Sequence, residues 1–75
     1  MGKIEEIISK TFEIKEEEIK KDLTPEDIEK WDSLSQLNLL SSIEDEFKIN
    51  LEFDEIFTVM KIDDIYKLLE KKGVI

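Results

Sequence analysis

A stripe of large apolar residues in the middle of the chain most constrains its fold. Leucine, isoleucine and phenylalanine recur there every three or four residues, the spacing that gathers side chains on one side of an α-helix. The stripe consists of Leu34, Leu37, Leu40, Ile43 and Phe47. Polar and acidic residues fill most of the positions between them. The pattern therefore predicts a central amphipathic helix over residues 34–47.

The same spacing predicts three further helical segments. The first runs from about Lys3 to Phe12, a single turn covers residues 54–57, and a final helix covers residues 62–69. Lys71, Lys72 and Gly73 are typical of the C-terminal end of a helix. Cations are favourable at the negative end of the helix dipole, and glycine adopts the left-handed cap conformation. No strand-length alternation or internal repeat occurs. The chain is predicted to be all-α, a small four-helix bundle with three principal helices and one short one.

The sequence of residues 13–30 predicts a long loop, in which isolated apolar residues contact the core. We interpret the acidic triplet at residues 16–18 as a solvated charge run, because a calcium-binding EF-hand loop needs alternating oxygen ligands and a glycine. Residues 24–27 combine a cap residue, a proline and an acid, which predicts one brief helical turn. Trp31 is expected to anchor the loop on the bundle. Four phenylalanines are expected in the core: Phe12, Phe47, Phe53 and Phe57.

Length and charge narrow the class of protein. A chain of 75 residues with two glycines and one proline suits one domain over residues 1–75 and a monomer. A net charge of -9 repels nucleic acid and favours basic protein surfaces. Without cysteine or histidine the chain can form no disulfide, zinc site, Ser-His triad or Cys nucleophile, so we expect no enzyme and no metal. No apolar run is long enough for a membrane span, and a cytoplasmic location is expected.

Ser33 stands out at the start of the central helix. Asp32 occupies a natural N-cap position, which places Ser33 at the first helical position. A side chain there points outward beside unpaired backbone N–H groups and the positive end of the helix dipole, surroundings that suit a phosphate ester. No neighbouring base could activate the hydroxyl. Ser33 is therefore predicted to be the substrate of another protein.

The string Asp32-Ser33-Leu34, followed by further leucines and by the acidic run that ends in Phe47, resembles an acyl carrier protein along nearly the whole chain. The resemblance implies a 4'-phosphopantetheine arm on Ser33, flanked by Asp32 and Leu34. A separate phosphopantetheinyl transferase (holo-carrier synthase) would attach it from coenzyme A. The arm would then carry acyl or aminoacyl groups as thioesters between acyl-activating, acyltransferase or condensing enzymes.

The resemblance also implies an acidic second-helix surface that docks basic patches on partner enzymes. The partner-binding residues expected there are Gln36, Leu37, Glu44 and Asp45. Trp31 before the motif, and the lack of acids just after it, resemble stand-alone accessory carriers of lipid, polysaccharide or secondary-metabolite biosynthesis more than housekeeping fatty acid carriers. Fatty acid biosynthesis stays open as the pathway. The alternative is an unmodified acidic helical adaptor that binds a basic protein partner.

Overall fold

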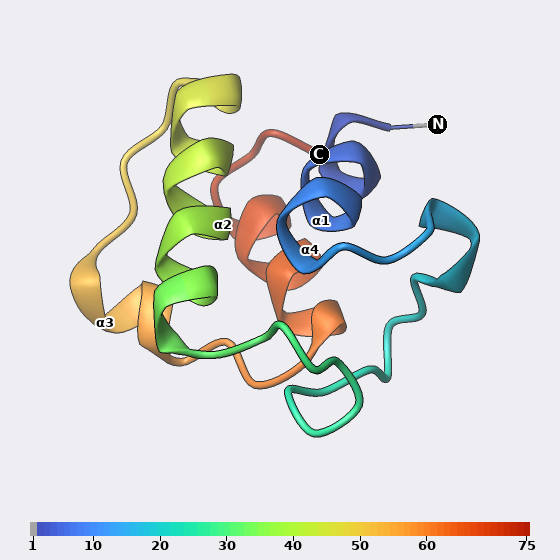
Figure 1. Cartoon of the computed structure of the whole chain (residues 1–75). Helices are drawn as coiled ribbons and strands as arrows, with labels where there is room; N and C mark the ends of the chain where they lie inside the picture. Colours follow the sequence, from blue (N-terminus) through green and yellow to red (C-terminus); the bar gives the residue numbers. More distant parts are fainter. Residues whose placement is uncertain (1) are drawn as a thin grey trace.

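The structure is a computed structural model and describes residues 2–75. Every regular element of the described chain is helical (Figure 1). The elements are α1 (Lys3–Phe12), the short 3₁₀ helix η1 (Glu16–Glu18), α2 (Ser33–Phe47), α3 (Phe53–Phe57) and α4 (Ile62–Lys71). The prediction of an all-α bundle with three principal helices and one short helix is confirmed.

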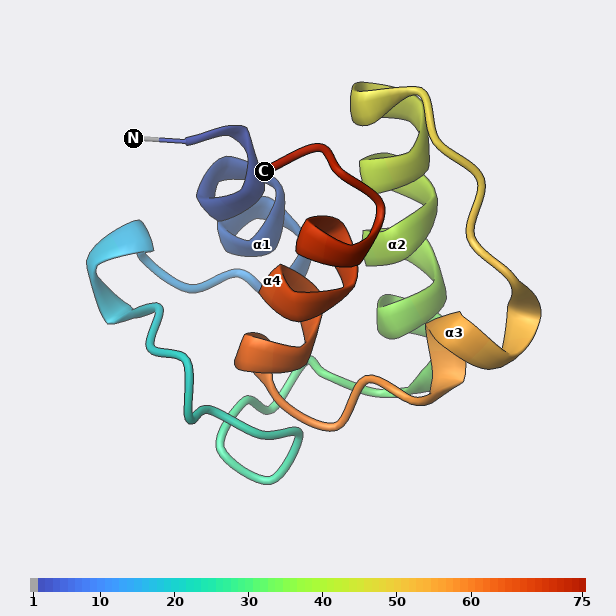
Figure 2. The same ribbon diagram turned by 180° about the vertical axis from the view of Figure 1, so that it is seen from behind.

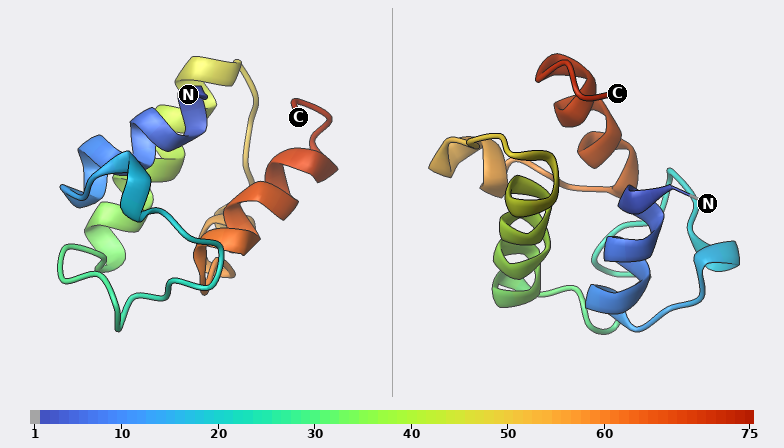
Figure 3. Two further views of the ribbon diagram at one scale, coloured as in Figure 1. Left: turned by 90° about the vertical axis from the view of Figure 1, so that its right-hand side faces the viewer. Right: turned by 90° about the horizontal axis from the view of Figure 1, so that it is seen from above.

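The helices surround one common core. α1 packs against α2, Figure 3 shows α4 to one side of this pair, and Figures 1 and 2 show α3 beside the start of α2. The left view of Figure 3 places the long loop at the end of the bundle opposite the two termini. The core draws its largest fully buried side chains from all three principal helices: Ile8, Phe12, Leu39, Leu40, Ile43, Ile62, Ile65 and Leu69.

The face that α2 buries differs from the predicted stripe. Leu40 and Ile43 are fully buried, but Leu34 is 67% exposed and Leu37 is 36% exposed. Residues spaced by three on an α-helix shift by about 60° at each step, so the line from Leu34 to Ile43 moves half a turn around the helix. Leu39 fills the inner face instead. The start of α2, next to Ser33, therefore presents leucine to the solvent.

The phenylalanines divide between core and surface. Phe12 is buried and Phe47 is partly buried against the core, as predicted. Phe53 is 75% exposed and Phe57 is 40% exposed, so the prediction that they are core residues is wrong. They are four residues apart on α3, on one side, and their ring centroids are 4.9 Å apart. A helix of five residues has room to bury one large side chain, and Ile56 takes that place.

The long loop is more ordered than predicted. The acidic triplet forms η1 and has no buried residue, which agrees with a solvated charge run, and the Glu18 carboxylate accepts a 2.8 Å hydrogen bond from the Lys15 backbone N–H. Residues 24–27 form the predicted single turn, closed by a 2.9 Å hydrogen bond from the Asp27 N–H to the Thr24 carbonyl, and the Asp27 carboxylate accepts a bond from the Thr24 backbone N–H at 3.0 Å. In both cases an acid reaches back to the backbone N–H at the start of its own turn, a donor that no helical carbonyl satisfies.

The loop also caps α4. The first two N–H groups of α4, on Ile62 and Asp63, donate to the carbonyls of Leu23 and Lys21, both at 2.9 Å. These donors lack intrahelical partners, and α4 has no side-chain cap. The middle of the loop is thereby held against the start of α4.

Tyr66 joins the two ends of the chain. Its hydroxyl donates to the carboxylate of Glu5, which links α4 to α1, and the Lys21 ammonium lies 5.7 Å from its ring centroid. The hydrogen bond from Tyr66 lowers the pKa of Glu5, whereas burial raises the pKa of Tyr66.

Candidate functional site

The site begins with the cap of α2. Asp32 adopts an extended backbone (φ -120°, ψ -176°), and its Oδ1 accepts a 2.8 Å hydrogen bond from the Ser35 backbone N–H. This bond is the main reason why the pKa of Asp32 is lowered. Ser33 is the first residue of α2, and it is exposed. The predicted cap and helix-start positions are both confirmed.

A buried tryptophan fixes the approach to Ser33. Trp31 is 4% exposed and stacks on Phe12 with ring centroids 4.8 Å apart. Its indole Nε1 donates to Gln36 Oε1 at 2.9 Å. The predicted role of Trp31 as an anchor of the loop is confirmed, and the anchor lies two residues before the exposed serine.

Gln36 does not lie on the outward face of α2, where it was expected to contact partners. It is 7% exposed, and its Nε2 donates to the Ile56 carbonyl of α3 at 2.5 Å. One signal in the sequence could have revealed this. Gln36 lies three and four residues before Leu39 and Leu40, which places it in line with the buried face.

The residues that face outward on α2 form a separate line. They are Leu34, Asn38, Ser41 and Asp45, at spacings of three and four residues, and all are exposed. The acidic character of this line is limited to its far end, at Asp45. Next to Ser33 this line presents the apolar side chain of Leu34.

Ser33 lies on the flank of α2 that faces α3. Ser33, Leu37 and Glu44 follow one another along the helix at spacings of four and seven residues, which puts them on one side. Glu44 is partly buried, and its Oε2 accepts a 2.8 Å hydrogen bond from the backbone N–H of Leu51, in the segment that leads into α3. The carboxylate of Glu44 thus holds this segment, while that of Asp45 is exposed.

This arrangement can receive a group but cannot activate one. The chain has no histidine or cysteine. The carboxylate of Asp32 is a weak base, because its lowered pKa favours the ionised form. Within residues 2–75 no cluster of three acidic residues could hold a metal ion, and no helix of this part is long and apolar enough to cross a membrane.

Comparison with protein families assigns the chain to a family. The family model described as "Phosphopantetheine attachment site" matches residues 2–69. The chain belongs to this family of carrier proteins. Comparison with curated proteins gave no match. Members of the family are non-catalytic and bear a covalently attached 4'-phosphopantetheine, so the carrier is no enzyme, as predicted.

The geometry of the carrier at α2 fits such a group. An arm attached to the exposed Ser33 hydroxyl would keep its phosphate outside the packed core, beside the N–H groups of the first turn of a 15-residue helix. When bound, the arm would supply a thiol, a group that can hold cargo as a thioester. The protein supplies the fixed position from which the arm extends.

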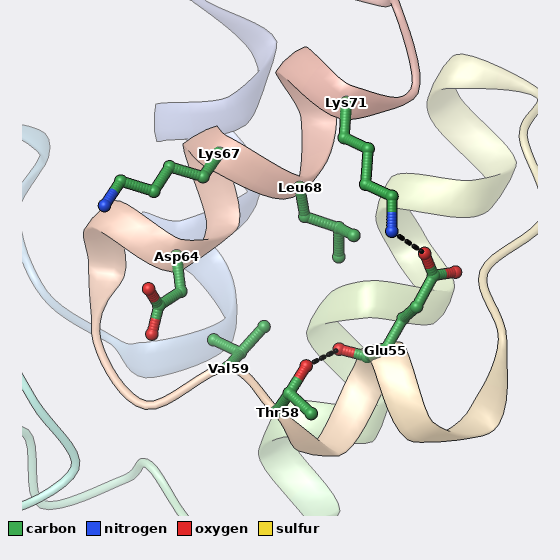
Figure 4. A pocket seen from close by; sticks show the side chains of 7 residues that line it. All are labelled: Glu55, Thr58, Val59, Asp64, Lys67, Leu68 and Lys71. Carbon is green, nitrogen blue, oxygen red and sulfur yellow. Dashed lines mark hydrogen bonds and ion pairs between the residues drawn. The ribbon is translucent and has the colours of Figure 1, made fainter.

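A cavity of about 210 Å³ lies elsewhere on the carrier, between α3 and α4 (Figure 4). Its lining residues are Glu55, Thr58, Val59, Asp64, Lys67, Leu68 and Lys71, and none of them comes from α2. Glu55 pairs with Lys71 at 3.4 Å and with Lys72 at 3.0 Å. Its carboxylate also accepts a hydrogen bond from the Glu52 backbone N–H, and these contacts lower the pKa of Glu55 to about 2. Figure 4 shows Lys71 reaching Glu55 across the opening, so this ion pair joins α3 to α4.

We expect acid to weaken this connection. Because the pKa of Glu55 is about 2 in the fold against 4.5 ordinarily, its stabilising effect is complete above about pH 4.5 and is lost as the pH falls toward 2. Glu55→Gln should lower the Tm at pH 7 and reduce the difference between the Tm values at pH 5 and pH 3. Thermal unfolding at several pH values measures both effects. The exposed Glu17→Gln serves as the control, and an unchanged pH profile for Glu55→Gln would contradict the assignment.

Proposed function

We propose that Ser33 is the residue that carries the 4'-phosphopantetheine arm of this carrier. The observation that supports it is the position of Ser33: exposed, first in α2, behind a carboxylate cap and a buried tryptophan. The other serines lack this combination. The Ser9 hydroxyl donates to the Ile14 carbonyl at 2.6 Å, and Ser41 and Ser42 lie in the middle of α2.

The carrier would shuttle acyl or aminoacyl groups as thioesters between acyl-activating, acyltransferase or condensing enzymes. A tethered group reaches several active sites at high effective concentration. The tryptophan before the motif supports an accessory pathway of lipid, polysaccharide or secondary-metabolite biosynthesis, with fatty acid biosynthesis as the alternative. A single domain over residues 1–75 that works as a cytoplasmic monomer is consistent with modification from coenzyme A and with a net charge of -9, which opposes self-association.

The test is the intact mass after incubation with coenzyme A and a promiscuous phosphopantetheinyl transferase. We expect a gain of one phosphopantetheine group, located on the peptide that contains Ser33 by fragmentation. A mass that does not change under conditions that modify a known carrier would favour the acidic adaptor instead.

Partner enzymes, the transferase included, would contact the outward line of α2. On that line Leu34 supplies an apolar contact next to Ser33, and Asp45 supplies charge further along the helix. Leu37, on the flank that carries Ser33, adds a second apolar contact. Glu44 contributes less to partner binding than its charge suggests, because its carboxylate already accepts a hydrogen bond from the Leu51 backbone N–H. Well-packed residues at the centre of an interface carry most of its energy, whereas charges at the rim mainly raise the rate of association.

Truncation of Leu34 tests this surface. Leu34→Ala should reduce the kcat/KM of modification by about tenfold or more, the effect of losing about 1.4 kcal/mol of contact, with little change in Tm because the side chain is exposed. Met60→Ala is the matched control, since Met60 is 68% exposed against 67% for Leu34 and lies outside α2. Equal rates for the two variants would remove Leu34 from the interface.

A further inference from the structure

The side chain of Gln36 joins three separate segments inside the bundle. Its Oε1 accepts from the indole of Trp31 at 2.9 Å, and its Nε2 donates to the carbonyl of Ile56 at 2.5 Å. Gln36 is the buried polar residue among the thirteen apolar side chains of the core. We call these two hydrogen bonds the Gln36 bridge. It connects the end of the long loop, the first turn of α2 and the end of α3.

Each end of the bridge meets a polar group that needs a partner. Ile56 lies near the end of a five-residue helix, where the last four carbonyls have no intrahelical donor. A buried indole N–H needs an acceptor in the same way. One amide satisfies both, so the three groups can stay away from water as long as they stay together.

The Gln36 bridge lies directly below the proposed attachment residue. Gln36 comes three residues after Ser33, which is less than one helical turn, and Ser33 is on the flank of α2 that faces α3. A chain tethered to Ser33 would therefore first meet the interior where α2 and α3 touch. We call this contact the α2–α3 seam. The bridge crosses it from Gln36 to Ile56.

Given Ser33 as the attachment residue, we propose that the Gln36 bridge closes the α2–α3 seam to long alkyl chains, so that the cargo is a short or polar acyl group held outside the bundle. An alkyl chain that entered would separate the amide from its partners and offer them no hydrogen bond in return. Beyond the bridge, Leu39, Leu40 and Ile43 have no exposed surface. The cavity between α3 and α4 includes no residue of α2 and is rimmed by charged side chains.

The first experiment loads the parent protein with straight acyl groups of two to twelve carbons, checks loading by intact mass, and measures Tm. A chain that enters the core should raise Tm by about 3–6 °C for each CH₂ removed from water. We expect a flat series. A steady rise with chain length in the parent protein would overturn the proposal, whereas a failure to load would concern Ser33 and the proposed function alone.

The second experiment removes the bridge. Gln36→Leu keeps a similar side-chain volume but removes the amide that forms both hydrogen bonds of the bridge. The unloaded variant should therefore have a lower Tm than the parent protein. Its Tm should then rise as the loaded acyl chain lengthens. Asn50→Leu is the control, since it makes the same chemical change at an exposed position outside α2 and should keep the flat series. A flat series for Gln36→Leu would also overturn the proposal.

A third measurement needs no loading and stands if Gln36→Leu does not fold. Trp31 is the one tryptophan of the chain, so its indole N–H gives a unique resonance. If the bridge is a closed barrier, this proton should exchange with solvent at least about 100-fold more slowly than in a short peptide, because exchange then requires opening of the structure. Exchange at the rate of the peptide would overturn the proposal.

Discussion

Ser33→Ala should abolish modification from coenzyme A and leave the fold almost unchanged. The hydroxyl is the proposed attachment point, and no other serine is both exposed and first in its helix behind an acid. The cap of α2 belongs to the carboxylate of Asp32, which accepts from Ser35, so losing the Ser33 hydroxyl removes no hydrogen bond of the cap. We expect a stability change within about 0.5 kcal/mol, the range typical of surface substitutions.

Intact mass after incubation with the transferase measures the modification, and thermal unfolding measures the fold. Ser35→Ala is the control, because it removes a serine two positions further along and should still be modified. Full modification of Ser33→Ala would overturn the assignment of the attachment residue. Loss of modification together with unfolding would instead show that Ser33 supports the structure of the site.

Trp31→Ala should have the largest effect on stability, about 3–5 kcal/mol. The indole is 4% exposed, stacks on Phe12 and donates to Gln36, so alanine creates a cavity and leaves the Gln36 amide oxygen without its donor. A small domain has a total stability of about 5 kcal/mol or slightly more. The variant should therefore be partly unfolded at room temperature.

Trp31→Phe separates the two contributions of the indole. Phenylalanine keeps a ring to stack on Phe12 but cannot donate to Gln36, so we expect a smaller loss of about 1–3 kcal/mol. Urea unfolding followed by far-ultraviolet circular dichroism suits both variants, since it does not depend on tryptophan fluorescence. A loss below about 1 kcal/mol for Trp31→Ala would show that Trp31 does not anchor the loop.

The sequence alone determined the positions of the helices and of the candidate serine. The helical spacing of apolar residues predicted α1, α2 and α4 closely, because such periodicity is a local property of the chain. The cap at Asp32 is local as well, since its carboxylate reaches a backbone N–H three residues away. The start of α2, with Ser33 at its first position, follows from that cap.

Only the tertiary structure decided which side of each helix is buried. Apolar residues spaced by three do not stay on one side of α2, so their spacing does not define the buried face. Packing against the neighbouring elements determines that Leu34 faces solvent and Gln36 faces α3. The same holds for Phe53 on α3, a helix of five residues that has too few positions to show a periodicity.

The Gln36 bridge depends on the tertiary structure for the same physical reason. Its hydrogen bond to the Ile56 carbonyl spans 20 residues of sequence, and a buried polar side chain is stable only where distant segments bring it a partner. The sequence therefore determined where an arm can be attached, and the packing of α3 against α2 decided what lies beneath it.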